Sequence, residues 1–317
     1  MPNRLNDQTG DNMSSQQGAA ARENEWLGYY DRFGYFSPEA VRDGCQPRIM
    51  EHPEPPKKAI VLVHGLSDSP WFMTAIGDYF FKRLGYNVYM PLLHCHGLKE
   101  PNGMEGVELE EWKSNVSFAV NTAASKAGEV SIGGLSTGGA LGLYMAAINP
   151  KIRGALYLFS AALDLAGGPF GLFGELKEKL LLTFLADLLD FNSPLIGDNP
   201  YRYSFVDMDG AAQLARLIKE TDTIIDLFDQ RFPFPGKVFA AHSKCDTTAD
   251  IAGIEALQKV SVPERFKRFD IDEDPGVPHA SVVLEQPIVG NDGKELEPRN
   301  PVFPEMMQAI AAFETIG

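Results

Sequence analysis

The chain has 317 residues, of which 44% are hydrophobic, and its formal net charge at pH 7 is −15. This length is sufficient for one large domain with an insertion, or for two domains. Because so acidic a surface repels phosphate backbones, the composition argues against nucleic acid as a partner. The three cysteines are widely spaced and imply no disulfide framework, which favours a reducing compartment and predicts a cytoplasmic protein.

The first part of the chain predicts a tail followed by a packed segment. Residues 1–24 are polar and lack the apolar stretch of a secretory signal, so we expect a disordered tail. Residues 25–40 are rich in aromatic side chains and are expected to pack on the folded domain. An edge strand is expected at Arg48–Met50. No apolar run is long enough to predict a membrane span.

Strand and helix patterns alternate along most of the chain. Ala59–Val63 is a continuous apolar run, which is typical of a buried central strand in a parallel sheet. We expect further strands at 87–90, 130–132, 155–160, 237–242 and 265–271, and helices starting at Ser69-Pro70 and at 108–126, 140–148 and 304–316. This alternation, without an internal repeat, predicts an α/β fold with a doubly wound, mostly parallel sheet.

Residues 164–235 interrupt the alternation, because they contain no convincing strand. Residues 171–190 are strongly apolar with helical spacing, and residues 211–228 form a second helical pattern. We interpret 164–235 as a helical cap inserted into a core formed by residues 25–163 and 236–317. The apolar part of such a cap would allow contact with a lipid surface, while its charged residues argue against a membrane span.

The stretch Gly134–Gly138 lies between a predicted strand and a predicted helix and has the Gly-x-Ser-x-Gly pattern of a nucleophile elbow. A sharp, strained turn would raise the Ser136 hydroxyl clear of the sheet, and the two glycines remove side chains that would collide there. The amide of Thr137, at the helix start, would point to where an oxyanion develops. The alternative is a glycine-rich turn with an incidental serine.

A serine nucleophile needs a base and an orienting acid, which follow the serine in this architecture in the order acid, then histidine. Only His242 and His279 follow Ser136. We predict His279 as the base, because it lies in a loop after the last long strand, where catalytic loops of open sheets gather. His242 closes a strand and is interpreted as a packed structural histidine. Asp246 is predicted as the acid, ahead of Asp164.

Two further histidine-containing segments follow strands of the first half of the sheet. Leu66 comes directly after His64-Gly65 and is predicted as the second oxyanion donor through its backbone amide. The segment His94-Cys95-His96 invites a metal interpretation, but alternate residues of an extended segment face opposite sides. No distal Cys/His pair completes a tetrahedral set, so we expect no metal.

These motifs together resemble the α/β-hydrolase superfamily and, within it, the carboxylesterase and monoacylglycerol-lipase-like group. The resemblance implies ester hydrolysis through an acyl-enzyme without metal or organic cofactor, and a cap that shapes the acyl pocket. Two departures stand out: Cys95 occupies a position where glycine is common, and residues 286–300 lengthen the connection between His279 and the last helix. The resemblance extends over residues 58–317 and is carried by Val63–Leu66, Pro91–Gly97, Gly134–Gly138, Asp246 and His279.

The sequence therefore predicts a serine hydrolase acting on small-molecule carboxylic esters with a medium or hydrophobic acyl group. Ser136 would attack, His279 would take its proton, Asp246 would orient the imidazole, and the amides of Leu66 and Thr137 would hold the oxyanion. One alternative is a lipase or lysophospholipase acting at lipid surfaces. Another is a non-catalytic ligand-binding protein that retains the fold. The absence of an aspartate at the nucleophile position disfavours epoxide hydrolase and dehalogenase chemistry.

Overall fold

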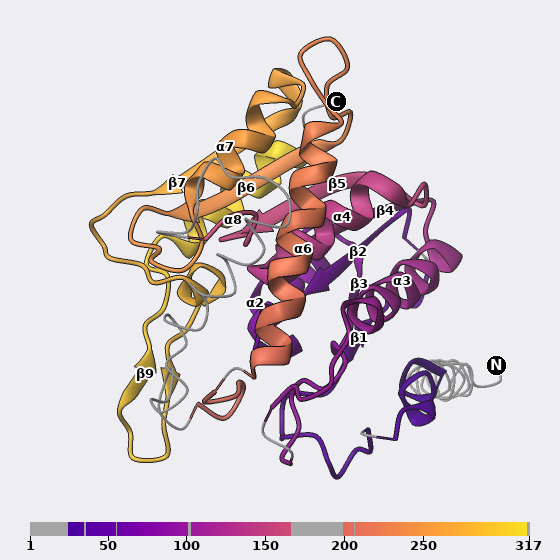
Figure 1. The fold of residues 1–317 in the computed structure, drawn as a ribbon, viewed down its shortest axis with the longest axis vertical. Coiled ribbons are helices and arrows are strands. Elements are labelled where there is room, and N and C mark those ends of the chain that lie inside the picture. The colour runs from indigo at the N-terminus through magenta and orange to yellow at the C-terminus, as the bar shows by residue number, and fades with distance from the viewer. Residues whose placement is uncertain are drawn as a thin grey trace, which may run out of the picture.

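A seven-stranded sheet forms the centre of the described structure (Figure 1). The structure is a computed structural model that describes residues 25–34, 36–54, 56–100, 103–165, 199–205 and 207–315. Its strands are β1 (Arg48–Met50), β2 (Lys58–Val63), β3 (Asn87–Met90), β4 (Glu129–Leu135), β5 (Ile152–Phe159), β6 (Lys237–Ser243) and β7 (Phe266–Ile271). The short strands β8 (Ile288–Val289) and β9 (Glu295–Glu297) pair separately as a hairpin.

The strand order is β1-β3-β2-β4-β5-β6-β7, and every neighbouring pair is parallel except β1 with β3. The chain moves outward in one direction from β2 to β3, and in the other direction from β4 to β7. The order therefore reverses between β2 and β4, and ligands of open α/β sheets bind at the carboxyl ends of strands beside such a reversal. The predicted α/β fold with a doubly wound, mostly parallel sheet is confirmed.

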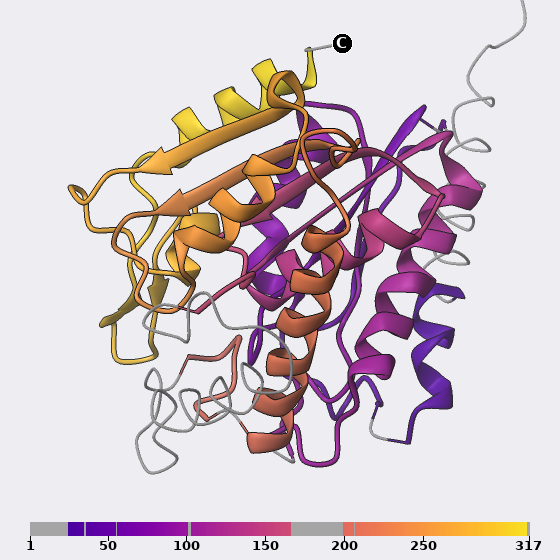
Figure 2. The ribbon, with the colours of Figure 1, turned by 45° about the horizontal axis from the view of Figure 1, so that its top comes forward.

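Helices cover both faces of this sheet (Figure 2). One face shares a hydrophobic core with α3 (Leu109–Lys126), α4 (Thr137–Ile148), α6 (Met208–Asp226) and α7 (Ile251–Lys259). The other face packs on α2 (Thr74–Lys82), α8 (Phe303–Glu314) and the 3-10 helices η2 (Pro70–Met73) and η4 (Ala280–Val283). The remaining 3-10 helices of the described residues are η1 (Tyr30–Arg32) and η3 (Pro263–Arg265).

The strands and helices expected within the described residues are present, with one difference at the first helix. Pro70 occupies the first helical position, as expected, but the chain forms the 3-10 helix η2 before α2 begins at Thr74. The hydroxyl of Ser69 makes no capping hydrogen bond. Instead the carbonyl of Ser69 accepts from the amide of Phe72 at 3.1 Å, the i to i+3 bond of a 3-10 turn.

The aromatic segment near the N-terminus packs on the domain, as predicted. Trp26 and Tyr30 are buried, and the Tyr29 ring stacks on Phe118 of α3 with ring centroids 3.8 Å apart. The Tyr30 hydroxyl accepts a hydrogen bond from the amide of Leu92 at 2.9 Å. The segment thereby covers the edge of the α3 layer. The predicted tail, residues 1–24, and the predicted apolar helix, residues 171–190, lie outside the described residues.

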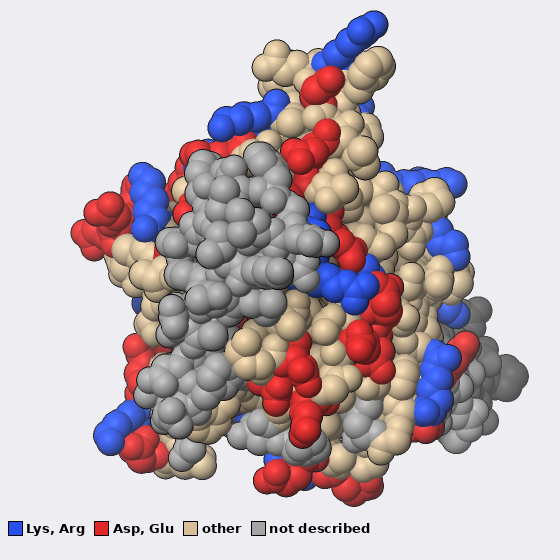
Figure 3. Space-filling model, viewed as in Figure 1, with Lys and Arg blue, Asp and Glu red and all other residues tan. Residues whose placement is uncertain are grey.

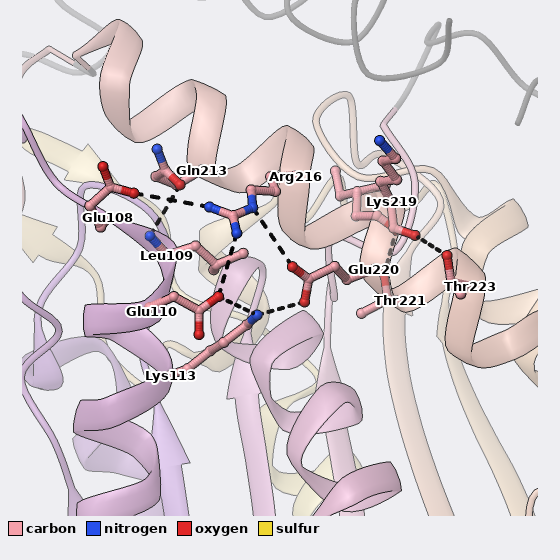
Figure 4. Close-up of polar contacts among 11 residues, drawn as sticks. Glu108, Leu109, Glu110, Lys113, Gln213, Arg216, Lys219, Glu220, Thr221 and Thr223 are labelled. Carbon is pink, nitrogen blue, oxygen red and sulfur yellow. Dashed lines mark hydrogen bonds and ion pairs between the residues drawn. The ribbon is translucent and has the colours of Figure 1, made fainter. Parts of the chain in front are cut away.

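Helix α6 corresponds to the second helical pattern predicted in the 164–235 segment, and it packs against α4 and α3. Figure 4 shows the polar contacts between α6 and α3. Lys113 of α3 is nearly buried, and its Nζ lies 2.6 Å from a carboxylate oxygen of Glu220 and 3.0 Å from one of Glu110. Arg216 lies 3.6 Å from Glu110, and Gln213 accepts from the amide of Leu109. This part of the segment thus lies in the helical layer on the sheet.

The surface reflects the acidic composition. On the face shown in Figure 3, Asp and Glu side chains occur in several groups, with Lys and Arg side chains between them and uncharged areas around them. Among the described residues, no helix is long and apolar enough to cross a membrane.

The contact between α3 and α6 predicts a measurable loss of stability on replacing Lys113 with Met. The substitution removes the cation 2.6 Å from the partly buried Glu220 carboxylate and leaves only the half-exposed Arg216 at 3.8 Å, so we expect the free energy of unfolding to fall by about 2 kcal/mol. Adding Glu220→Gln should restore part of this loss. Urea unfolding measures both, with the exposed Lys82–Asp78 pair as control, since Lys82→Met should cost less than about 0.5 kcal/mol. Equal losses for Lys113→Met and Lys82→Met would contradict this account.

Candidate active site

Ser136 lies at the turn between β4 and α4 in a strained conformation, with φ 54° and ψ −118°. The surrounding backbone holds this conformation in place. The amide of Ser136 donates to the carbonyl of Phe159 at 3.0 Å. Its carbonyl accepts from the amides of Gly139 at 2.9 Å and of Ala140 and Ala162 at 3.1 Å. Contacts to the end of β5 therefore fix the elbow together with the first turn of α4.

The two glycines of the elbow are required by close backbone contacts. A Cβ at Gly134 would lie 2.4 Å from the carbonyl carbon of Gly138, and a Cβ at Gly138 would lie 2.1 Å from the carbonyl oxygen of Val63. No larger residue fits at either position without moving a strand or the helix. The close approach of β2, β4 and α4 is therefore the reason why glycine is needed at both positions, as the sequence predicted.

His279 and Asp246 form a hydrogen-bonded pair at the same edge of the sheet, on the loops that follow β7 and β6. The Nδ1 atom of His279 lies 2.7 Å from Oδ2 of Asp246, whose side chain is fully buried. The other carboxylate oxygen accepts from the amides of Thr248 at 2.8 Å and Ala249 at 2.9 Å. Burial raises the pKa of Asp246, but His279 and these hydrogen bonds outweigh burial, so the net pKa is lowered. An ionised carboxylate favours the imidazole tautomer with Nδ1 protonated, and Nε2 is then available as a base.

The two other candidates in this half of the sheet have different surroundings. A carboxylate oxygen of Asp164 accepts from the amide of Leu165, and its carbonyl accepts from the amide of Asp250. These contacts join the end of β5 to the start of α7. His242 is buried, with Nε2 3.9 Å from Oδ2 of Asp246, and burial lowers its pKa. His242 therefore packs as a neutral ring beside Asp246.

Residues 64–69, which we call the β2 loop, lie against Ser136. A Cβ at Gly65 would be 3.3 Å from Cβ of Ser136, and the partly exposed Leu66 follows directly. The ring of His64 is buried, which lowers its pKa well below the usual value. Its Nε2 accepts from the amide of Leu93 at 3.1 Å, so Nδ1 is the donor to the carbonyl of Gly65 at 2.9 Å. A neutral histidine thus fastens the β2 loop to the loop after β3.

The two histidines of the segment His94-Cys95-His96, which follows β3, contact different residues. Nε2 of His94 lies 3.3 Å from a carboxylate oxygen of Glu111. The ring of His96 is fully buried, packs on Trp112, and has its pKa lowered by burial to about 4. In the ranges that the structure describes, no group of three or more His, Cys, Asp or Glu side chains is placed to hold a metal ion.

Cys95, which replaces a common glycine, adopts the left-handed backbone conformation that glycine favours, with φ 58°. The hydroxyl of Tyr203 donates to the carbonyl of Cys95 at 2.9 Å and accepts from the amide of Leu98 at 3.1 Å. These two hydrogen bonds hold the turn in the conformation that the cysteine itself disfavours.

A buried charged cluster beside the β2 loop has no counterpart in the sequence analysis. Oδ1 of Asp68 accepts from Nε of Arg202 at 2.8 Å and from Nη2 at 2.5 Å. Nη1 of Arg202 lies 3.1 Å from Oε1 of Glu297, which also accepts from the side-chain amide of Asn199 at 2.6 Å. Burial raises the pKa of Asp68, and it raises the pKa of Glu297 to about 7 even though Arg202 opposes both shifts. The sequence offers one weak signal for this cluster, an aspartate two residues after the predicted oxyanion donor Leu66.

The raised pKa of Glu297 predicts a specific pH dependence of stability. The folded protein binds this proton more tightly than the unfolded chain, so the free energy of unfolding falls as the pH rises from about 4.5 to about 7. Glu297→Gln removes this effect, and its stability relative to the wild type should increase by up to about 3 kcal/mol across that window. Urea unfolding at about pH 5 and pH 8 measures the difference. The exposed Glu295→Gln on the same hairpin is the control, and a pH-independent difference for Glu297→Gln would refute the prediction.

Comparisons with known proteins agree with this fold. A model of the alpha/beta hydrolase family matches residues 60–312. The chain is 27% identical over 224 residues to the thermostable monoacylglycerol lipase of Bacillus sp. (strain H-257), covering 69% of this chain and 84% of that protein. A soluble variant of the monoglyceride lipase of Saccharomyces cerevisiae, solved with a substrate analogue, has a TM-score of 0.59 at 13% identity, covering 88% of this chain and 97% of that chain.

A structure from work on the metagenome-derived lipolytic enzymes LipS and LipT has a TM-score of 0.61 at 17% identity, covering 86% of this chain and 98% of that chain. At these identities the solved structures support the fold, whereas the family match extends over most of the sequence. The chain belongs to the alpha/beta hydrolase family and is similar to its monoacylglycerol-lipase-like members.

Proposed function

We propose that this protein is a serine hydrolase that cleaves carboxylic esters through an acyl-enzyme. The observation that carries the proposal is the 2.7 Å hydrogen bond between His279 and the buried Asp246. Both residues follow strands that run parallel to β4, so they lie at the sheet edge where Ser136 stands in its strained turn. A base already oriented by a carboxylate is what a serine hydroxyl needs to become a nucleophile.

The proposed reaction assigns one role to each residue. His279 takes the Ser136 proton as the hydroxyl attacks the ester carbonyl, and Asp246 stabilises the imidazolium that forms. The amides of Leu66 and Thr137 donate to the oxyanion, and the position of Thr137 at the N-terminus of α4 adds the helix dipole. The imidazolium then gives its proton to the leaving alcohol. A water molecule activated by His279 releases the acyl group in the second half of the reaction.

We further propose that the substrate carries a medium or hydrophobic acyl group, with monoacylglycerols among the candidates. The Bacillus relative is named a monoacylglycerol lipase, and residues 171–190 are strongly apolar in sequence. In this proposal residues 164–235 are the insertion that contributes the cap over a core of residues 25–163 and 236–317, while α6 within this insertion packs on α4 and α3. The lipolytic names of the relatives favour action at a lipid surface as the second candidate. A rate that rises sharply above the substrate's micelle concentration would support that candidate, and a smooth saturation curve would count against it.

Labelling with a fluorophosphonate probe tests the nucleophile directly. The wild type should be labelled and should hydrolyse p-nitrophenyl esters of increasing chain length. Ser136→Ala should lose the label and at least about 10⁴-fold in kcat. Ser125→Ala, an exposed serine on α3, is the matched control and should behave as the wild type. An unreactive wild type that still binds a hydrophobic ligand would favour the non-catalytic alternative, and an active Ser136→Ala would exclude Ser136 as the nucleophile.

Asp246→Asn tests the acid. The amide cannot stabilise the imidazolium and favours the wrong imidazole tautomer, so kcat should fall by about 10³- to 10⁴-fold with KM changed little. Steady-state kinetics on a p-nitrophenyl ester provide the measurement. Asp164→Asn is the matched control, because Asp164 is the rival acid and its carboxylate accepts from the amide of Leu165, while the Asp246 carboxylate pairs with His279. A larger loss for Asp164→Asn than for Asp246→Asn would reverse the assignment.

A further inference from the structure

The buried guanidinium of Arg202 joins three segments that are distant in sequence, and one of them lies against Ser136. These segments are the β2 loop, residues 199–203 and the β8–β9 hairpin. Arg202 is 8% exposed and contacts Asp68 of the β2 loop and Glu297 of the hairpin. Its guanidinium also lies over the ring of Phe72, 4.6 Å from the centroid. None of these residues has a step in the proposed reaction.

The two carboxylate oxygens of Asp68 contact different groups. Oδ1 receives both hydrogen bonds from Arg202. Oδ2 faces the backbone of Gly65, where an added Cβ would lie 2.5 Å away. The amide of Asp68 donates to the carbonyl of Gly65 at 3.2 Å. Asp68 thus closes the turn that carries the amide of Leu66.

This turn needs external support, because Ser67 has a left-handed backbone with φ 64°, which is unfavourable for a residue with a side chain. The amide of Tyr203 donates to the carbonyl of Ser67 at 2.8 Å. Arg202 and Tyr203 therefore both bind this turn. Arg202 does so through its side chain, and Tyr203 does so through its backbone amide. The carbonyl of Arg202 is held in turn by Nη1 of Arg42 at 2.6 Å.

Stability alone does not explain this arrangement. Burying charges costs desolvation energy, and apolar side chains of similar volume often stabilise a protein as well or better. An ion pair does supply directional contacts. Here the pair orients Asp68 against the backbone of Gly65, the residue before the expected oxyanion donor Leu66. A position of this amide that is wrong by a fraction of an ångström weakens the hydrogen bond to the transition state.

We propose that Asp68 and Arg202 are positioning residues that hold the Leu66 amide in place for the oxyanion. They act through the backbone of Gly65 and Leu66 and do not touch the substrate. This inference rests on the proposed function, in which Leu66 donates to the oxyanion.

The test compares Asp68→Asn, Arg202→Lys and Glu297→Gln in steady-state kinetics and in binding of a trifluoromethyl ketone, whose adduct with the serine places an oxyanion in the same position. Complete removal of an oxyanion donor costs about 10²- to 10³-fold in kcat. A displaced donor should cost less, so Asp68→Asn and Arg202→Lys should lower kcat by roughly 10- to 100-fold with KM within about threefold. The affinity for the ketone should fall in parallel, and Glu297→Gln, one contact further away, should have the smallest effect.

Lys113→Met is the control for general loss of stability, because it breaks a nearly buried ion pair at the contact between α3 and α6. It should lower the melting temperature while kcat and ketone affinity stay unchanged. If Asp68→Asn does not fold, Arg202→Lys carries the test, since it keeps the positive charge and loses the paired contact to one oxygen.

The inference is overturned if Asp68→Asn and Arg202→Lys keep kcat and ketone affinity within about twofold of the wild type, or if Lys113→Met loses as much kcat as they do. If either result is found and the wild type still reacts with the fluorophosphonate, this inference fails but the proposed function stands. A wild type that neither reacts with the probe nor hydrolyses esters overturns the proposed function and this inference with it.

Discussion

The packing of three backbone segments against one another determines where Ser136 stands. The ends of β2 and β4 and the start of α4 approach so closely that neither Gly134 nor Gly138 has space for a Cβ. Val63 pairs with Gly134 across parallel strands, so the residues that follow both strands leave the sheet side by side. One backbone contact therefore places the elbow and the β2 loop together. The position of Ser136 and the direction in which the β2 loop leaves the sheet both depend on this contact.

Asp246 and His279 are fixed in another way, because they lie on loops beyond the ends of β6 and β7. The side chain of Asp246 is fully buried, and its carboxylate is tolerated there because it receives hydrogen bonds from His279, Thr248 and Ala249. Each of these bonds restrains the loop that supplies it. The neutral ring of His242 fills the space beside the carboxylate without competing for its charge. The geometry of the pair thus follows from satisfying one buried charge.

Features with a local pattern could be predicted from the sequence, and features that depend on contacts between distant residues could not. The strands were predictable from continuous apolar runs, and the contact between Asp246 and His279 from the order of both residues after Ser136 along the chain. A lone Arg202 in a loop has no local pattern, and its pairing with Asp68 is a contact across 134 residues. The helical spacing of α6 predicted a helix, but periodicity alone does not say that its apolar face packs on α4 and α3. The 3-10 turn at Pro70–Met73 depends on the hydrogen bond from the amide of Phe72 to the carbonyl of Ser69, which the spacing of apolar residues does not predict.

The lengthened connection after His279 acquires a physical role through the same cluster. Residues 286–300 form the β8–β9 hairpin, which brings Glu297 to Arg202 and so adds a second buried carboxyl group to the Asp68 pair. Two carboxylates and one guanidinium would leave a net negative charge in a region of low dielectric, which is costly. The pKa of Glu297 near 7 reduces that cost, because the group takes up a proton more readily than an exposed glutamate does. The ion pair between Glu297 and Arg202 thus attaches the hairpin to this cluster, and Glu297 is the group whose charge is reduced by burial. Asp68 retains its two hydrogen bonds to the guanidinium of Arg202.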